Sequence, residues 1–205
     1  MKKLIISAII AGIAISAQAQ DFSMEDMGKP DPARVPAGTY SVDTYHSHIV
    51  YDVSHFGISQ YIGLIGNLSG KLKIDPAHPE KAEVEIDIPL SGLVSTSAPL
   101  DAHLKTSDFF DIEKFPNAKF KSSSVEVNGT DAVISGQLTI RDVTKPVKLQ
   151  ARLVGVAVNP MSALLNVGFD ARTQIKRSDF GVSHYVPFVS DEVELRISVV
   201  FEGTE

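Results

Sequence analysis

Apolar and polar residues alternate with a period of two along most of the chain after residue 39. In one segment, four apolar residues, Val84, Ile86, Ile88 and Leu90, alternate with Glu83, Glu85 and Asp87. Alternation of this kind is typical of β-strands with one apolar and one solvated face. The pattern recurs in three later apolar rows: Leu149, Ala151 and Leu153; Leu165, Val167, Phe169 and Ala171; and Val193, Leu195, Ile197, Val199 and Phe201. We therefore expect eight or nine strands.

Two of the expected strands fit together in a single antiparallel register. The turn at residues 75–81 joins the strand that begins at Glu83 to an earlier apolar row, made of Ile62, Leu64, Leu68, Leu72 and Ile74. Pairing Lys73 with Glu83 and Lys71 with Glu85 also brings apolar residues together, Leu72 with Val84 and Leu68 with Ile88. Because one register satisfies both faces, we predict a hairpin with Leu68 and Ile88 on its inner side.

Two further local signals predict a turn and a helix. Asn128-Gly129 lies between two alternating segments and indicates a two-residue hairpin turn. Residues 98–106 have helical periodicity, with Ser97 as a candidate N-cap and with Leu100 and Leu104 on one face. This segment is the one helix that we expect.

Glycines at positions 63, 66 and 70 fall within one expected strand. Glycine weakens strand pairing, but it permits the sharp coiling that closing a sheet into a barrel requires. Together with the regularly spaced strands, these glycines favour a closed barrel over a sandwich. A barrel of about eight strands is wide enough to be filled by side chains or to hold one slender ligand.

The first 19 residues have the three parts of a secretory signal peptide. Lys2 and Lys3 precede an apolar run over residues 4–15, and a small-x-small site ends at Ala19. We expect cleavage after Ala19 and a periplasmic mature protein. The run is shorter than the roughly 20 residues of a membrane-spanning helix, and we expect no integral membrane segment after processing. Residues 20–37 contain three prolines and are expected to form a flexible lead-in outside the core.

Composition narrows the range of partners. The chain has no cysteine, which excludes disulfides, thiolate metal sites and a lipidated N-terminal cysteine. The net charge of the chain is -6, and removing Lys2 and Lys3 makes it -6 - 2 = -8. A charge of this sign disfavours nucleic acid and charge-driven docking on anionic lipid. A lipid ligand would have to be held by apolar burial.

Four motifs resemble those of the YceI-like family of lipid-binding barrels. They are DTYHSHIVYDVSHFG at 43–57, DAHLKTSDFFDIEKFPNAKF at 101–120, GQLTIRDVTKPVKL at 136–149 and IKRSDFG at 175–181. The resemblance spans residues 38–202 in order. It implies an all-β fold over residues 38–205, a single antiparallel eight-stranded lipocalin-like barrel with one short helical connection. It also implies a secreted, non-catalytic carrier of isoprenoid-type lipids.

Inward apolar residues form an ordinary core in many barrels, and a structural module filled by its own side chains remains an alternative. The resemblance implies instead a long, narrow cavity that holds a polyprenyl chain. The expected partner is a polyisoprenoid, an isoprenoid quinone or a fatty-acid-amide-like lipid. The residues that we expect to line this lumen are Ile49, Tyr51, Val53, Leu64, Leu68, Ile86, Phe109, Phe110, Phe169 and Phe180.

Six polar residues are candidate contacts for the ligand head group: His46, His48, Asp101, His103, Arg141 and Arg177. Each arginine could instead form an ion pair with a neighbouring carboxylate, Asp142 or Asp179. Members of the family commonly have Arg-Asp ahead of the His-Leu dipeptide, where this chain has Leu100-Asp101. Because that cation is missing, a neutral head such as a quinone or an amide is favoured over a pyrophosphate.

The histidines leave an enzymatic alternative open. On a strand, His46 and His48 would point to the same face, and with His103 they could serve a metal-assisted hydrolase or isomerase. The chain has no HExxH motif, however, and the resemblance implies no catalytic metal. We therefore expect no catalytic residue, metal or cofactor, and we expect the histidines to form a polar cluster near one barrel end with Asp43, Asp52 and Asp101. Whether two copies form a homodimer stays open.

Overall fold

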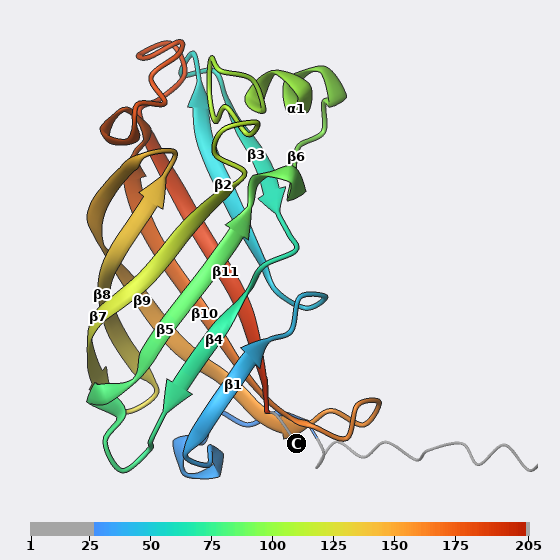
Figure 1. Ribbon diagram of the computed structural model, residues 1–205, viewed down its shortest axis with the longest axis vertical. Helices are drawn as coiled ribbons and strands as arrows, with labels where there is room; N and C mark the ends of the chain where they lie inside the picture. The colour runs from blue at the N-terminus through green and yellow to red at the C-terminus, as the bar shows by residue number, and fades with distance from the viewer. Residues whose placement is uncertain (1–26, 204–205) are drawn as a thin grey trace, which may run out of the picture.

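The computed structural model describes residues 27–203, which form a closed antiparallel β-barrel (Figure 1). The barrel closes because the first strand pairs with both the fourth and the last strand. Its eight staves, in spatial order, are β1 (Gly38–Val42), β4 (Ser69–Ile74), β5 (Glu83–Pro89), β7 (Asn117–Asn128), β8 (Asp131–Ile140), β9 (Val143–Val158), β10 (Leu165–Lys176) and β11 (Glu192–Gly203). The predicted eight-stranded barrel is confirmed.

Three further strands extend the wall toward the end of the barrel that carries the helix. They are β2 (His48–His55), β3 (Ser59–Ile65) and β6 (Leu93–Val94). We call the end with helix α1 (Ala98–Leu104) the upper end and the opposite end, where β11 finishes, the lower end (Figure 1). Strand β11 pairs with β1 near the lower end and with β2 nearer the upper end.

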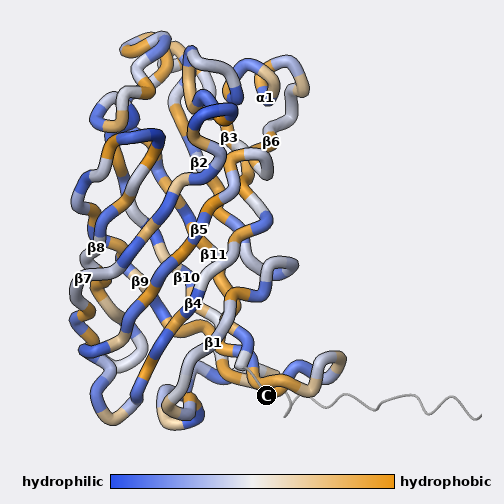
Figure 2. Tube along the Cα trace, viewed as in Figure 1, coloured by the Kyte–Doolittle hydropathy of each residue, from blue (hydrophilic) through white to orange (hydrophobic). Residues whose placement is uncertain are grey.

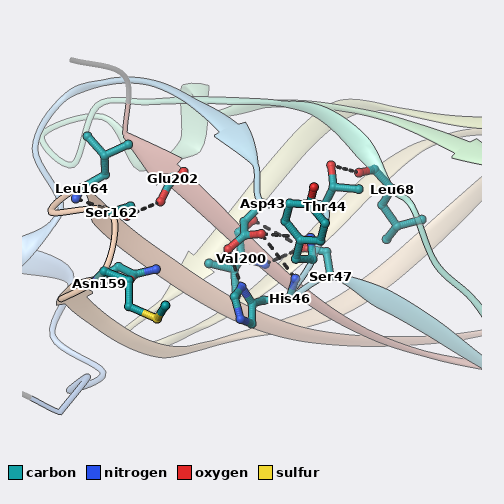
Figure 3. A network of polar contacts seen from close by, with 12 residues as sticks. Asp43, Thr44, His46, Ser47, Leu68, Asn159, Ser162, Leu164, Val200 and Glu202 are labelled. Carbon is teal, nitrogen blue, oxygen red and sulfur yellow. Dashed lines mark hydrogen bonds and ion pairs between the residues drawn. The ribbon is translucent and has the colours of Figure 1, made fainter.

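The turn at residues 43–47 connects β1 to β2, and both of these strands pair with β11. The N–H of Asp43 donates to the carbonyl of Val200 in β11 (2.8 Å), and the N–H of Val200 donates to the hydroxyl of Ser47 (3.0 Å). The hydroxyl of Thr44 donates to the carbonyl of Leu68 (3.0 Å), as Figure 3 shows. These bonds fasten the turn to the strands on both sides.

The hairpin of β4 and β5 has the predicted register. Its pairs include Lys71 with Glu85, Leu72 with Val84 and Lys73 with Glu83. The ladder ends at the pair of Ser69 with Asp87. The predicted pair of Leu68 with Ile88 would be the next one and is not part of the ladder. Both side chains are nevertheless buried in one apolar cluster.

The apolar row expected from Ile62 to Ile74 changes face in the middle. Between β3 and β4 the chain bends at residues 66–68, and Asn67 adopts a left-handed conformation with φ of 59°. The bend shifts the alternation by one residue, so Leu68 is buried whereas Ile62 and Leu64 are 47% and 44% exposed. The expectation of a single strand with one apolar face was therefore wrong.

Two other local predictions hold with adjustments. Asn128 pairs with Asp131, so the predicted hairpin is present but its two-residue loop is Gly129-Thr130. Helix α1 ends at Leu104, and Ser97 occupies its N-cap without a capping side-chain bond. The carboxylate of Asp101 instead accepts hydrogen bonds from the N–H and the hydroxyl of Ser95 (2.7 and 2.6 Å).

Residues 28–37 pack against the lower end of the barrel. The carbonyl of Lys29 accepts a hydrogen bond from the N–H of Val156 in β9 (2.9 Å), and a short 3₁₀ helix, η2 (Pro32–Arg34), follows. Val35 is only 4% exposed and belongs to the core. The expected lead-in outside the core was wrong for this part, because Val35 packs against the inner wall. The expected signal peptide and its cleavage site lie outside the described residues.

The inner face of the barrel is apolar along its length. Colouring by hydropathy shows apolar and polar residues in turn along most strands (Figure 2). The buried side chains form three clusters, of which one includes Val156 and Phe201 and another includes Phe120 and Phe180. Within residues 27–203, no helix is long and apolar enough to cross a membrane.

Gly70 is required where β4 coils past β5, and Gly70→Ala should destabilise the protein by at least about 2 kcal/mol. Gly70 has φ of 146°, and a Cβ there would collide with the backbone carbonyl of Glu85. Urea unfolding followed by circular dichroism measures the effect. The control is Gly66→Ala, because a Cβ at Gly66 meets nothing within 4 Å. Equal stability of the two variants would contradict the requirement for glycine at position 70.

Candidate ligand-binding site

The barrel encloses two adjoining apolar cavities. The lower one, of about 300 Å³, is lined by inward residues such as Leu72, Ile86 and Phe201. The upper one, of about 370 Å³, lies beneath α1 and the upper loops. The cavities share four lining residues, which are Ile49, Ile88, Leu138 and Leu195. They therefore follow one another along the barrel, and we refer to them together as the lumen.

Most of the expected lumen residues line these cavities. Ile49 borders both, the lower cavity adds Leu68, Ile86 and Phe169, and the upper cavity adds Tyr51, Val53, Phe109 and Phe110. Two residues do not line them. Leu64 points outward from β3, opposite Val50 and Val94, as a result of the bend described above. Phe180 is buried in the wall cluster with Phe120 and Ile175.

Sequence reasoning missed part of the upper cavity, which is also lined by Leu100, Leu104, Tyr61, His55, Tyr185 and Val189. Leu100 and Leu104 were recognised as one face of a helix, and the cavity explains what that face covers. The remaining residues come from the ends of β2 and β3 next to their turn and from the loop before β11. Only the closed barrel brings these segments together, so no local pattern could have revealed them.

Tyr51 places a polar atom without a partner in the largely apolar lumen. Its ring crosses Gly63 on the neighbouring strand β3, where a side chain would collide with it. The hydroxyl is buried and has no hydrogen-bond partner. Burial, with the nearby Asp101 and Tyr61, raises the pKa of Tyr51 to about 12. The phenol therefore stays protonated at neutral pH and can donate a hydrogen bond.

Arg177 is buried and organises the loop before β11. Its guanidinium donates four hydrogen bonds of 2.8 to 2.9 Å to backbone carbonyls, those of Val182, His184, Val189 and Ser190. The expected ion pair with Asp179 does not form. Burial lowers the pKa of Arg177, and the charge of Asp191 opposes this shift. The carbonyls satisfy four of its five N–H donors and hold the loop over the upper cavity, which Arg177 also lines.

Arg141 ties two upper loops together. Its Nη1 donates to the carbonyls of Phe109 (3.3 Å) and Gly181 (3.2 Å), and its guanidinium lies over the ring of Phe115. The expected ion pair with Asp142 is again absent. Its Nε is buried without a partner. Both arginines thus use carbonyls where we expected carboxylates, because the chain reverses above the barrel and presents unpaired carbonyls there.

The expected polar cluster is divided between distant parts of the barrel. His46 lies in the β1–β2 turn, where its Nδ1 is 2.6 Å from Asp43 (Figure 3), and His48 lies on the outer face of β2 opposite Ser198. Neither residue lines the lumen. His103 is at the upper end, where its Nε2 is 2.8 Å from Asp108. The metal set of His46, His48 and His103 was therefore wrong.

The barrel and its enclosed apolar lumen define a lipocalin-like binding fold. Within this class, the chain belongs to the YceI-like family, because the family model for the YceI-like domain matches residues 40–201. A UPF0312 protein of Pseudomonas fluorescens is 32% identical over 100% of this chain and 99% of its own length. Protein YceI of Salmonella arizonae is 34% identical over 82% and 88%, respectively.

Solved structures share the fold. A YceI protein of Campylobacter jejuni aligns with a TM-score of 0.65 and 28% identity, covering 74% of this chain and 90% of its own. BcnA of Burkholderia cenocepacia aligns with a TM-score of 0.69 and 22% identity, covering 78% and 98%. A polyisoprenoid binding domain from Saccharophagus degradans aligns with a TM-score of 0.63 and 15% identity, covering 80% and 98%.

The stability of the loop that Arg177 holds should depend on pH through the protonation of Asp191. Burial acts to raise the pKa of Asp191, but hydrogen bonds from the hydroxyl and N–H of Ser178, with the charge of Arg177, outweigh it and lower the pKa. A lowered folded-state pKa stabilises the protein above the ordinary value of 3.8, and this contribution is lost as the pH falls through the folded-state pKa.

Asp191→Asn should therefore lower the melting temperature at pH 7, and the gap from the wild type should narrow as the pH falls below 3.8 and through the lowered pKa of Asp191. Thermal unfolding followed by circular dichroism across this range measures both. Asp179→Asn, an exposed change in the same 3₁₀ helix η5 (Arg177–Phe180), is the control and should have little effect. A gap for Asp191→Asn that stays constant with pH would refute the assignment.

Proposed function

We propose that this protein binds a long-chain amphiphile of the polyisoprenoid type in the barrel lumen and carries or stores it without changing it chemically. The observation that carries the proposal is the pair of adjoining apolar cavities along the barrel axis. Each is within the volume range of small-molecule sites. A linear tail fits this shape because the two cavities lie end to end along the barrel.

The energetics of burial favour a tail over a polar ligand. Removing each methylene-sized group from water contributes about 0.8 kcal/mol, and the loss of overall ligand motion is paid mainly once. Affinity should thus rise with each isoprene unit until the lumen is full. A charged ligand would meet few polar partners in this largely apolar lining, which disfavours it.

The polar end of the ligand belongs at the upper end in this proposal. Tyr51 offers a protonated hydroxyl without a partner, whereas Arg177 already donates to four carbonyls. A hydroxyl donor suits a neutral acceptor such as a quinone or amide carbonyl. Val35 and Pro32 of η2 line the lower cavity. The tail would therefore point toward the lower end.

Family membership supports a binding role. The domain from Saccharophagus degradans is described as polyisoprenoid binding, and it shares this fold at 15% identity. Likeness at that level supports the architecture, while the apolar lining of this chain supports the ligand class. We further propose a periplasmic location, on the strength of the signal-peptide features of residues 1–19.

Fluorescent polyprenyl analogues of graded length test the lumen. Affinity for the wild-type protein should rise with length and then level off. Ala171 lines the lower cavity, so Ala171→Phe should fill part of it. We expect affinity in this variant to level off at a shorter tail, with short tails bound as before. Because the added ring occupies space that is already open, the fold should persist.

Leu64→Phe is the matched control, since it adds a ring on the outer face of β3 and should leave the length dependence unchanged. Affinity that does not depend on tail length, or an identical plateau in the Ala171→Phe variant, would overturn the lumen proposal. Melting temperatures of both variants establish that they remain folded.

Tyr51→Phe tests the position of the head group. The variant should be at least as stable as the wild type, because it removes a buried hydroxyl that has no partner. Its affinity for an isoprenoid quinone should fall by about three- to tenfold, the value of one hydrogen bond, while a polyprenyl hydrocarbon should bind unchanged. Equal affinities of wild type and variant for the quinone would place the polar end elsewhere.

A further inference from the structure

Three potential metal ligands meet at the upper end, although they come from separate parts of the sequence. His103 belongs to α1, Asp108 follows it in the next loop, and His184 lies in the loop before β11. Within residues 27–203, these three form the group whose ligand atoms all lie within 4.8 Å of one another. His103 Nε2 and Asp108 Oδ2 are already 2.8 Å apart.

The donor set suits a transition-metal ion. Zinc binds imidazole nitrogen and carboxylate oxygen at about 2.0–2.2 Å, which separates neighbouring ligand atoms by roughly 3.3 Å in a tetrahedral shell. The three atoms can reach this spacing by small side-chain rotations. Two imidazoles and one carboxylate also leave further coordination positions open.

The surroundings hold these side chains in place. The rings of His103 and His184 meet edge to face with centroids 5.7 Å apart, and Phe109 packs edge-on against both, at 5.1 and 5.4 Å. The carbonyl of His184 is fixed by Arg177. The hydroxyl of Thr106 donates to the carbonyl of His103 and accepts from the N–H of Asp108. Ligands held in this way lose little freedom when an ion binds.

The group differs from the other histidine–carboxylate pairs of the described chain. His46 with Asp43 and His78 with Glu80 are also close, at 2.6 and 3.6 Å, but neither pair belongs to a group of three. The side chains of His103 and Asp108 are 34% and 50% exposed, so an ion can reach them from solvent. Phe109 and Tyr185 separate this position from the lumen, which they line.

We propose that His103, Asp108 and His184 bind one divalent transition-metal ion, of the zinc class, at the rim of the upper cavity. The site differs from the set of histidines that the sequence suggested, and it does not depend on the proposed lipid ligand. The ion would join α1 to the loop before β11. It would also place a Lewis acid beside the mouth of the lumen.

Zinc titration of the protein tests this proposal, using protein without a histidine tag that has first been treated with a chelator. Competition with a chromophoric chelator gives the affinity and stoichiometry, and we expect one equivalent. Asp108→Asn preserves shape, and His184→Ala preserves the carbonyl that Arg177 holds; each should weaken zinc binding by at least about tenfold. Cobalt should give a visible absorption spectrum in the wild type that both variants lose.

His78→Ala and His46→Ala are the controls and should bind zinc as the wild type does. The proposal is overturned if no zinc binds, if Asp108→Asn and His184→Ala both bind as well as the wild type, or if a control variant loses the ion. Circular dichroism establishes that each variant is folded. Lipid binding measured in chelator tests the lumen separately, so failure of one proposal is distinguishable from failure of the other.

Discussion

The structure depends on the pairing of β11 with two successive strands on the same edge. Its lower part pairs with β1 and its middle with β2, and the turn at residues 43–47 is fastened to Val200. Without β1 on that edge, the sheet would stay open and expose an apolar row to water. Closure removes the free edges of the eight-stranded wall, which then surrounds an apolar interior. The lumen is therefore a consequence of hydrogen bonding between the first and last strands.

The sequence predicted those features of the fold that depend on residues close together in the chain. The β4–β5 register followed from charges and apolar residues that agree on one alignment, and the inward rows of β9, β10 and β11 followed from alternation. The face of Leu64 could not be predicted in this way, because a three-residue bend reverses the parity. The roles of Val35 and Arg177, and the meeting of His103 with His184, depend on contacts between remote segments.

The upper end concentrates backbone strain as well as polar groups. Four residues other than glycine have positive φ there, which are Phe56, Asp111, Arg141 and Tyr185. Bulky residues in this conformation are strained, and such strain persists where surrounding contacts impose it. The carbonyl bonds of Arg141 and Arg177 supply such contacts. At the lower end, Val35 packs into the core, and the lower cavity reaches the β7–β8 turn at Gly129 and Thr130.

The bond between Lys29 and Val156 and the pairing of Val42 with Phe201 join residues that are far apart in sequence. Contacts of such long range form late in folding, because a large loop must close before they contribute stability. During synthesis, β1 has no β11 to pair with until the whole domain has been made. A chain that lacks β11 therefore cannot form the lumen, and a ligand of the proposed kind would enter after the last strand has joined the first.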